Sequence, residues 1–233
     1  MLHVLISRSR FSMRMFKAVI FDWDGTLADT RRTVTESFRR VLSEAGYTIS
    51  DEFIDRRIGV GTRKIMEDAL RECGIDFNEE ELERLVERKI EFQTELTGAV
   101  DLFEGAVELL DALYGRVKIA LATMGPKKVV DRLLSEKSIR RYFDVVVTAD
   151  EVPKPKPNPE IFLKAARRIK VRPEECLVVE DSIFGVKAAK AAGMGCVAVP
   201  SGAYTAEELR KEEPDLLINS LKEKERIMEL IQQ

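Results

Sequence analysis

The sequence predicts an α/β fold in which a parallel sheet is interrupted by an all-helical insertion. From residue 100 onward, short aliphatic runs alternate with segments whose apolar residues have helical spacing. Such alternation is typical of parallel sheets joined by right-handed crossovers. Residues 28–98 break this rhythm, because they carry helical apolar faces and no strand-like run. The 233 residues, 45% of them hydrophobic, are enough for one domain with an inserted subdomain.

Six short runs are predicted to be strands. Most of them are aliphatic and free of polar residues, as expected of strands that are buried on both faces of a parallel sheet. They cover residues 17–21, 117–122, 145–147, 176–180, 196–199 and 216–218.

Capping signals place helices between these strands. Pro126 is suited to the first turn of one helix, and Asn158 with Pro159 opens a second. Ser182 is placed to cap a third helix, which stops at Gly193.

The insertion is predicted to consist of helices. Their apolar faces begin at Val34, Ile65 and Leu82. The Glu-rich stretch 79–91 is predicted to be the solvent-exposed face of one of these helices. We therefore divide the chain into an N-terminal extension, a core in two pieces and the insertion. The bounds are 1–14 for the extension, 15–27 and 99–233 for the α/β core, and 28–98 for the insertion.

The composition excludes several classes of function. Lys plus Arg number 38 and Asp plus Glu number 41, and this near balance argues against a nucleic-acid partner. The only histidine is His3, so histidine-based triads and His-rich zinc sites are not expected. No apolar run reaches the roughly 18 residues of a membrane span. The N-terminal order of apolar and basic residues is wrong for a signal peptide, so we expect a cytoplasmic protein without a membrane partner.

The balance of polar residues is thermophile-like. Charged residues make up 34% of the chain, whereas Asn and Gln number only three each. Many charges and few heat-labile amides are typical of thermophilic proteins. We therefore expect an unfolding midpoint above about 60 °C.

Two acidic doublets follow predicted strands. Asp22 and Asp24 come directly after the first strand, and Glu180 with Asp181 ends the run 176–180. In a parallel sheet, ligands bind at the carboxyl ends of the strands. Carboxylates gathered there repel one another unless a cation neutralises them, and Mg²⁺ prefers such oxygen ligands. The alternative interpretation is a polar turn for the first doublet and an acidic helix cap for the second.

A hydroxyl and a lysine complete the pattern. Thr123 ends another predicted strand and is followed by Met124, at a helix start whose free backbone N–H groups suit an anion. Lys156 lies in a segment stiffened by Pro155, Pro157 and Pro159, so its amine can be held in one place. Alternatively, Thr123 belongs to an ordinary turn and Lys156 to an exposed linker.

Together these residues predict phosphoryl transfer. A carboxylate can attack phosphorus to give an aspartyl-phosphate, and a second carboxylate can protonate the leaving oxygen and then activate water. Mg²⁺, a lysine and a hydroxyl would offset the charge of the transferring group.

The motifs resemble those of the haloacid dehalogenase-like superfamily over about residues 15–220. The stretch Asp-Trp-Asp-Gly-Thr-Leu from Asp22 resembles the first motif and Thr123 the second. Lys156, followed by Pro-Asn-Pro-Glu-Ile-Phe, resembles the third, and Glu180-Asp181 the fourth. The resemblance implies a Rossmann-like parallel-sheet core, with the insertion as a four-helix cap that closes over the site.

The resemblance also implies roles for these residues. Asp22 would be the nucleophile and Asp24 the general acid and base, while Thr123, Met124 and Lys156 would bind the transferring phosphate. Mg²⁺ would be held by Asp22, the backbone carbonyl of Asp24 and Asp181, with Glu180 as a ligand directly or through water. Because Asp24 is an aspartate, the chain resembles the phosphotransfer branch rather than the dehalogenase branch.

The segment Ile-Gly-Val-Gly-Thr-Arg at 58–63 resembles the cap loop of phosphoglycolate phosphatase-like members. Arg57 or Arg63 is predicted to meet an anionic group of the substrate; the alternative is an interhelix turn with surface arginines. The β-phosphoglucomutase-like members share this cap and all four motifs.

The resemblance thus predicts a Mg²⁺-dependent phosphatase acting on a small phosphorylated metabolite, phosphoglycolate-like or a sugar phosphate. The first alternative is a sugar phosphomutase, and the second is a catalytically idle binding protein on the same scaffold. The sequence leaves the substrate and the choice between monomer and homodimer open.

Overall fold

The computed structural model describes residues 15–232. The predicted N-terminal extension, residues 1–14, and His3 within it lie outside the described residues. No helix in the described part of the chain has the length and apolar character needed to cross a lipid bilayer.

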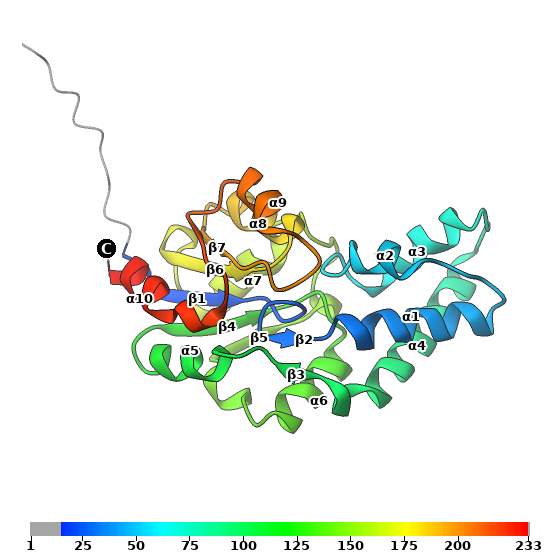
Figure 1. The fold of residues 1–233 in the computed structure, drawn as a ribbon, viewed down its shortest axis with the longest axis horizontal. Helices are drawn as coiled ribbons and strands as arrows, with labels where there is room; N and C mark the ends of the chain where they lie inside the picture. Colours follow the sequence, from blue (N-terminus) through cyan, green and yellow to red (C-terminus); the bar gives the residue numbers. More distant parts are fainter. Residues whose placement is uncertain (1–14, 233) are drawn as a thin grey trace, which may run out of the picture.

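A six-stranded parallel sheet forms the centre of the protein, which confirms the predicted fold class (Figure 1). The strand order is β5-β4-β1-β6-β7-β8. The strands are β1 (Ala18–Phe21), β4 (Lys118–Ala122), β5 (Val145–Val147), β6 (Cys176–Glu180), β7 (Gly195–Ala198) and β8 (Leu216–Leu217). Each lies within one residue of a predicted strand. β1 therefore lies between β4 and β6, which brings the ends of these three strands together.

Helices cover both faces of the sheet. Alternate residues of β1 show why: Val19 and Phe21 pack into one apolar layer, and Ala18 and Ile20 into the other. The first layer contains α5 (Ala106–Leu113), α6 (Lys127–Glu136) and α10 (Lys224–Gln232). The second contains α7 (Glu160–Ile169), α8 (Ile183–Ala191) and α9 (Ala206–Lys211). Ser182 caps α8 as predicted, because its hydroxyl accepts a hydrogen bond from the Gly185 N–H.

Four further helices pack around an apolar cluster of their own and project to one side of the sheet (Figure 1). They are α1 (Arg31–Glu44), α2 (Asp51–Asp55), α3 (Thr62–Glu72) and α4 (Glu79–Glu95), and we call them the helical unit. The short α2 has no counterpart among the apolar faces predicted from the sequence.

A two-stranded antiparallel ribbon connects the helical unit to the core. It pairs β2 (Ala28–Asp29) with β3 (Asp101–Leu102). The sequence analysis was wrong to find no strand at 28–29, because a two-residue strand has no apolar alternation to detect. The ribbon holds the two crossings between core and helical unit side by side.

Candidate active site

The site lies where β1, β4 and β6 end. Asp22 follows β1, Thr123 follows β4, and Glu180 is the last residue of β6. β4 and β5 lie on one side of β1, whereas β6, β7 and β8 lie on the other. In α/β proteins, ligands bind at the point where the strand order changes direction in this way.

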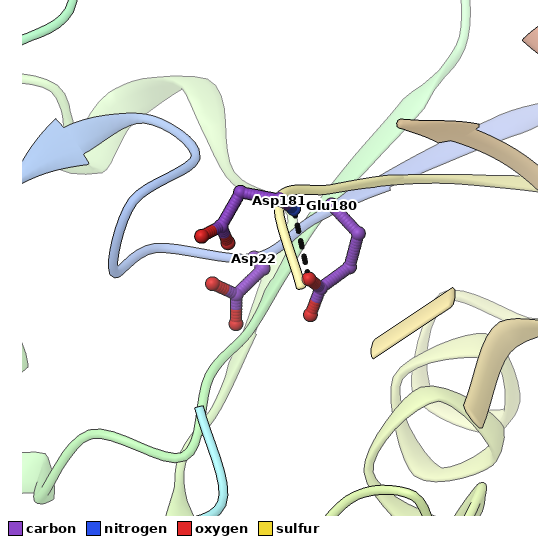
Figure 2. Close-up of side chains that lie close together, drawn as sticks. All are labelled: Asp22, Glu180 and Asp181. Carbon is purple, nitrogen blue, oxygen red and sulfur yellow. Dashed lines mark hydrogen bonds between the residues drawn. The ribbon is translucent and has the colours of Figure 1, made fainter. Parts of the chain in front are cut away.

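Three buried carboxylates gather at this edge. Asp22, Glu180 and Asp181 each offer an oxygen, and these oxygens lie within 4.8 Å of one another. Figure 2 shows the carboxylates of Asp22 and Asp181 close together, with that of Glu180 beside them. This is the only such cluster among the residues the structure describes. The structure thus brings the two predicted acidic doublets together.

Lys156 is buried between two of these carboxylates. Its Nζ lies 2.6 Å from Asp22 Oδ1 and 2.6 Å from Glu180 Oε1, and the residue is 1% exposed. The side chain also lies over the Phe162 ring, 4.8 Å from its centroid. The interpretation of Lys156 as part of an exposed linker is therefore wrong.

Glu180 is held by donors on both of its oxygens. Oε1 accepts from Lys156, while Oε2 accepts from the N–H groups of Asp181 and Ser182, each at 2.9 Å, and from the Ser182 hydroxyl at 3.0 Å. This arrangement fixes Glu180 as a support for the Lys156 ammonium and leaves it less available than Asp22 or Asp181 to a cation.

Asp181 has glycine backbone next to one of its carboxylate oxygens and a hydroxyl next to the other. A Cβ placed on Gly25 would lie 2.3 Å from Asp181 Oδ2, and one placed on Gly202 would lie 1.8 Å from it. The Thr26 hydroxyl donates to Oδ1 at 3.0 Å. Glycine is therefore required at both positions by close approach to this carboxylate.

Asp24 and Thr123 meet at the other side of the cluster. The Thr30 hydroxyl donates to Asp24 Oδ1 at 2.7 Å, and the Thr123 hydroxyl donates to Oδ2 at 3.3 Å. Thr123 in turn accepts from the Gly125 N–H at 2.9 Å. Sequence reasoning missed Thr30, since a threonine before a helix reads as an ordinary cap.

Burial dominates the electrostatics of the site. It raises the pKa of Asp22 well above the usual value, and the charge of Lys156 offsets this only in part. Burial also raises the pKa of Asp181, and the charges of Glu180 and Asp22 add to the effect. Lys156 behaves differently: burial alone would lower its pKa, but the carboxylates of Asp22 and Glu180 raise it above the ordinary value.

The residues present fit a magnesium ion. The donors are carboxylate oxygens, the ligands that Mg²⁺ prefers. Lys156 supplies one positive charge against the three carboxylates of the cluster, so a divalent cation would offset the remaining negative charge. The close approach of Gly25 and Gly202 keeps bulky groups away from Asp181 Oδ2.

The helical unit lies against the site through its loop before α3. Gly59 and Gly61 of this loop have φ values of 100° and 95°. A Cβ on Gly59 would lie 3.5 Å from Ser182 Oγ, and one on Gly61 would lie 3.1 Å from Met124 Cε. The predicted cap loop therefore does contact the core beside Thr123 and Glu180.

A small cavity remains between this loop and the core. Its volume is about 20 Å³. Its core side is formed by Asp24, Met124, Gly125 and Pro126, and the helical unit forms the rest with Val34, Phe38, Ile58, Gly59, Gly61, Thr62, Ile65, Lys89 and Gln93. A single water needs about 10–15 Å³, so in this conformation the cavity has room for little more than one water and not for a substrate.

Neither predicted arginine reaches this cavity. Arg57 packs over the Phe53 ring and donates to the Phe53 carbonyl oxygen. Arg63 forms ion pairs with Glu79 and Glu83 on the outer surface of the helical unit. These contacts agree with the alternative interpretation, in which the two arginines belong to an interhelix turn and the protein surface.

Lys89 of α4 lines the cavity instead, and the sequence analysis missed it. The Glu side chains of the stretch 79–91 do face solvent, but Lys89 is 2% exposed. A signal was present: position 89 continues the apolar stripe through Leu82 and Val86 at helical spacing. A lysine on an apolar stripe is a candidate functional residue.

Comparisons with known proteins agree with this geometry. Residues 19–199 match the family model for haloacid dehalogenase-like hydrolases. The chain is 33% identical to the fructose-1-phosphate phosphatase of Escherichia coli, over 79% of this chain and 96% of that protein. It is 32% identical to phosphoglycolate phosphatase 1 of Pseudomonas aeruginosa, over 91% and 80%. The solved β-phosphoglucomutase of Clostridium difficile has a TM-score of 0.84 and 28% identity, covering 93% of this chain and 97% of that one.

Proposed function

Because this chain belongs to the haloacid dehalogenase-like hydrolase family and is a phosphoric monoester hydrolase, we propose that it hydrolyses a small phosphomonoester through a phosphorylated Asp22. The substrate is phosphoglycolate or a similar small phosphate, such as a sugar phosphate. The observation that carries the proposal is the buried Lys156 ammonium, held 2.6 Å from Asp22 Oδ1 at the strand ends. A lysine in this position stabilises negative charge next to the nucleophile.

The first step is attack of an Asp22 oxygen on phosphorus. The bond from phosphorus to the leaving oxygen breaks as the bond to Asp22 forms, and Asp24 gives its proton to the leaving oxygen. Burial raises the pKa of Asp24, although its hydrogen bond from Thr30 acts in the opposite direction. A raised pKa suits a carboxyl group that must donate a proton near neutral pH.

The second step is hydrolysis of the phosphorylated Asp22. Asp24, now ionised, takes a proton from water as the water oxygen bonds to phosphorus and the bond to Asp22 breaks. Lys156 and the Thr123 hydroxyl donate to the phosphoryl oxygens throughout. Asp22, Asp181 and the Asp24 backbone carbonyl would hold Mg²⁺, whose positive charge would offset the negative charge of the phosphoryl group. Glu180 holds Lys156 in position.

The helical unit acts as the cap of this site. Its loop at Gly59 and Gly61 contacts the core directly, and the cavity beneath it has room for little more than one water. Closure over a bound substrate excludes bulk water until the leaving group has gone.

The test is Asp22→Asn, with phosphate release measured on phosphoglycolate and fructose 1-phosphate in the presence of Mg²⁺. We expect a loss in kcat on the order of 10³-fold or more, because the amide is a poor nucleophile. Asp29→Asn is the matched control, since Asp29 is an exposed aspartate a few residues further along the chain. Retained activity in Asp22→Asn would contradict the proposed nucleophile.

A second assay, on a hexose 1-phosphate, distinguishes the alternative of a sugar phosphomutase, which the likeness to the solved β-phosphoglucomutase favours. A mutase would convert a hexose 1-phosphate to the 6-phosphate faster than it releases free phosphate. We expect the opposite order of rates.

A further inference from the structure

Arg56 of the helical unit is bound by the core through several contacts at once. Arg56 follows α2, and its guanidinium donates to both oxygens of Glu208 of α9, at 2.7 Å to Oε1 and 3.3 Å to Oε2. It also donates to the Ala203 carbonyl oxygen at 3.2 Å and lies over the Tyr204 ring, 4.4 Å from its centroid. The Tyr204 hydroxyl donates back to the Arg56 carbonyl oxygen at 2.5 Å. Among residues 15–232, Arg56–Glu208 is the only ion pair between the helical unit and the core.

These contacts end on the loop that joins β7 to α9, residues 199–205, and this loop also lies against the active site. The Ser201 hydroxyl donates to the Gly25 carbonyl oxygen at 2.6 Å. The next residue is Gly202, whose backbone lies so close to Asp181 that an added Cβ would be 1.8 Å from Oδ2. One short loop therefore contacts both a proposed metal ligand and the helical unit.

We propose that Arg56 fastens the helical unit to loop 199–205 and that this loop positions Asp181, so that closure of the helical unit tightens Mg²⁺ binding. We call Arg56, Tyr204 and Glu208 the clasp. Its members are positioning residues, because they act on the metal through Asp181 rather than by contact with it. The inference rests on the proposed function, in which Asp181 is a Mg²⁺ ligand.

The clasp has the geometry of a specific contact. The guanidinium is planar, so an arginine that binds both oxygens of a carboxylate and stacks on a ring is held in one orientation. Tyr204 is 4% exposed, and the Phe184 ring meets it edge-on, with 6.3 Å between the ring centroids. Phe184 also packs against the apolar cluster of the helical unit. The clasp is therefore supported by packed side chains at the boundary between the helical unit and the core.

The topology of the sheet brings the clasp next to Asp181. β6 and β7 are parallel neighbours, so the loops that follow them emerge at the same edge of the sheet. A cavity of only about 10 Å³ lies between these loops and the helical unit. It is lined by Gly25, Asp181, Gly202, Ala203 and Tyr204 of the core and by Arg31, Asp55 and Ile58 of the helical unit. Because close-packed groups transmit displacements, a shift of loop 199–205 reaches the Asp181 carboxylate.

Thermodynamic linkage gives the coupling its direction. With the clasp formed, loop 199–205 is held in the arrangement that places Asp181 beside Asp22. With the clasp broken, part of the free energy of Mg²⁺ binding is spent on ordering this loop, so the affinity falls. Such coupling is reciprocal, and Mg²⁺ must therefore stabilise the clasp in turn.

The test is calorimetric titration of the full chain with Mg²⁺ in the absence of substrate, which measures the affinity without turnover. The wild type is compared with Arg56→Met, Arg56→Lys and Tyr204→Phe. Arg88→Met is the matched control, because Arg88 also stacks on an aromatic ring and pairs with a carboxylate. Its partners are Phe92, 4.1 Å from the ring centroid, and Glu44, and all three residues lie within the helical unit.

We expect Arg56→Met to lower the affinity for Mg²⁺ about 5- to 20-fold, within the range found for coupled sites. Arg56→Lys keeps the charge but loses the fork, so it should recover part of this loss. Tyr204→Phe removes one hydrogen bond and should lose less than Arg56→Met. Arg88→Met should bind Mg²⁺ as the wild type does.

Hydrogen exchange measures the reciprocal effect. Saturating Mg²⁺ should slow the exchange of the backbone N–H groups of residues 53–58 in the wild type, because it stabilises the clasp. In Arg56→Met this slowing should disappear.

Two results would overturn the coupling alone. If Arg56→Met binds Mg²⁺ with the wild-type affinity, or if Arg88→Met is weakened to the same degree, the clasp is only a structural contact. Exchange at residues 53–58 that does not respond to Mg²⁺ in the wild type has the same meaning. A wild type that binds no Mg²⁺ at all is a different outcome, because it contradicts the metal site of the proposed function and the coupling together.

Discussion

Lys156 of the core and Lys89 of the helical unit are equally buried, yet their surroundings are opposite. Lys156 lies between the carboxylates of Asp22 and Glu180, and these charges raise its pKa. Lys89 contacts an amide, a hydroxyl and an aromatic ring, and burial lowers its pKa to about 7. The core thus supplies counter-charges for its buried lysine, whereas the helical unit surrounds its lysine with neutral partners.

The largest difference is expected when each lysine is replaced by methionine. Lys156→Met leaves two carboxylates buried without their partner, so we expect a loss of about 3–5 kcal/mol in the free energy of unfolding. Activity should fall on the order of 10³-fold or more, since the group that offsets phosphoryl charge is gone.

Lys89→Met removes a buried charge that has no anionic partner, so the free energy of unfolding should stay within about 1 kcal/mol of the wild type or rise. Urea unfolding at pH 7.5 without Mg²⁺ measures both variants. Equal destabilisation by the two substitutions would show that the surroundings of the two lysines do not differ as described.

A smaller effect is expected when the two acids at the end of β6, Glu180 and Asp181, are replaced one at a time. Asp181→Asn removes a proposed Mg²⁺ ligand, so we expect the affinity for Mg²⁺ to fall about 10- to 100-fold, the range found even for groups that only support a metal ligand. Glu180→Gln should change this affinity by no more than a few-fold, because Glu180 is engaged by Lys156 and Ser182.

Calorimetric titration with Mg²⁺ in the absence of substrate measures these affinities independently of turnover. If the two substitutions weaken Mg²⁺ binding to the same degree, Glu180 is a direct ligand.

A pH series sharpens the contrast between the lysines further. Burial lowers the pKa of Lys89 to about 7, whereas in the unfolded chain the ammonium has its ordinary pKa of about 10.4. Between these two pKa values the unfolded chain binds a proton that the folded protein has lost. The free energy of unfolding of the wild type should therefore rise with pH by about 1.4 kcal/mol per pH unit relative to that of Lys89→Met. Lys156 stays charged over this range, because its pKa is raised rather than lowered.

The difference in the free energy of unfolding between the wild type and Lys89→Met is the informative quantity, since the other titrating groups are common to both proteins. A difference that stays constant between pH 7 and pH 10 would contradict the lowered pKa of Lys89.

The sequence predicted the core of the site well. The carboxyl ends of parallel strands meet at one edge of a sheet, so residues that follow β1, β4 and β6 are brought together by topology alone. The sequence alone therefore predicts that Asp22, Thr123 and Asp181 lie close together. Lys156 is further from its strand, and its placement was predicted from the stiff proline-rich segment around it.

The helical unit was harder to predict. Which of its side chains face the core depends on how the unit docks, and docking is decided by contacts far apart in the sequence. Arg63 was a reasonable candidate, but the nearby Glu79 and Glu83 pair with it on the outer surface. Lys89 could be recognised only by asking why a lysine stands on the apolar stripe of α4.

The most direct test of the proposed site is a crystal structure of Asp22→Asn with Mg²⁺ and phosphoglycolate. We expect this variant to bind the substrate without consuming it, with the phosphate beside residue 22 and Lys156 at the ends of β1, β4 and β6. A complex in which the phosphate lies away from these strand ends would contradict the account.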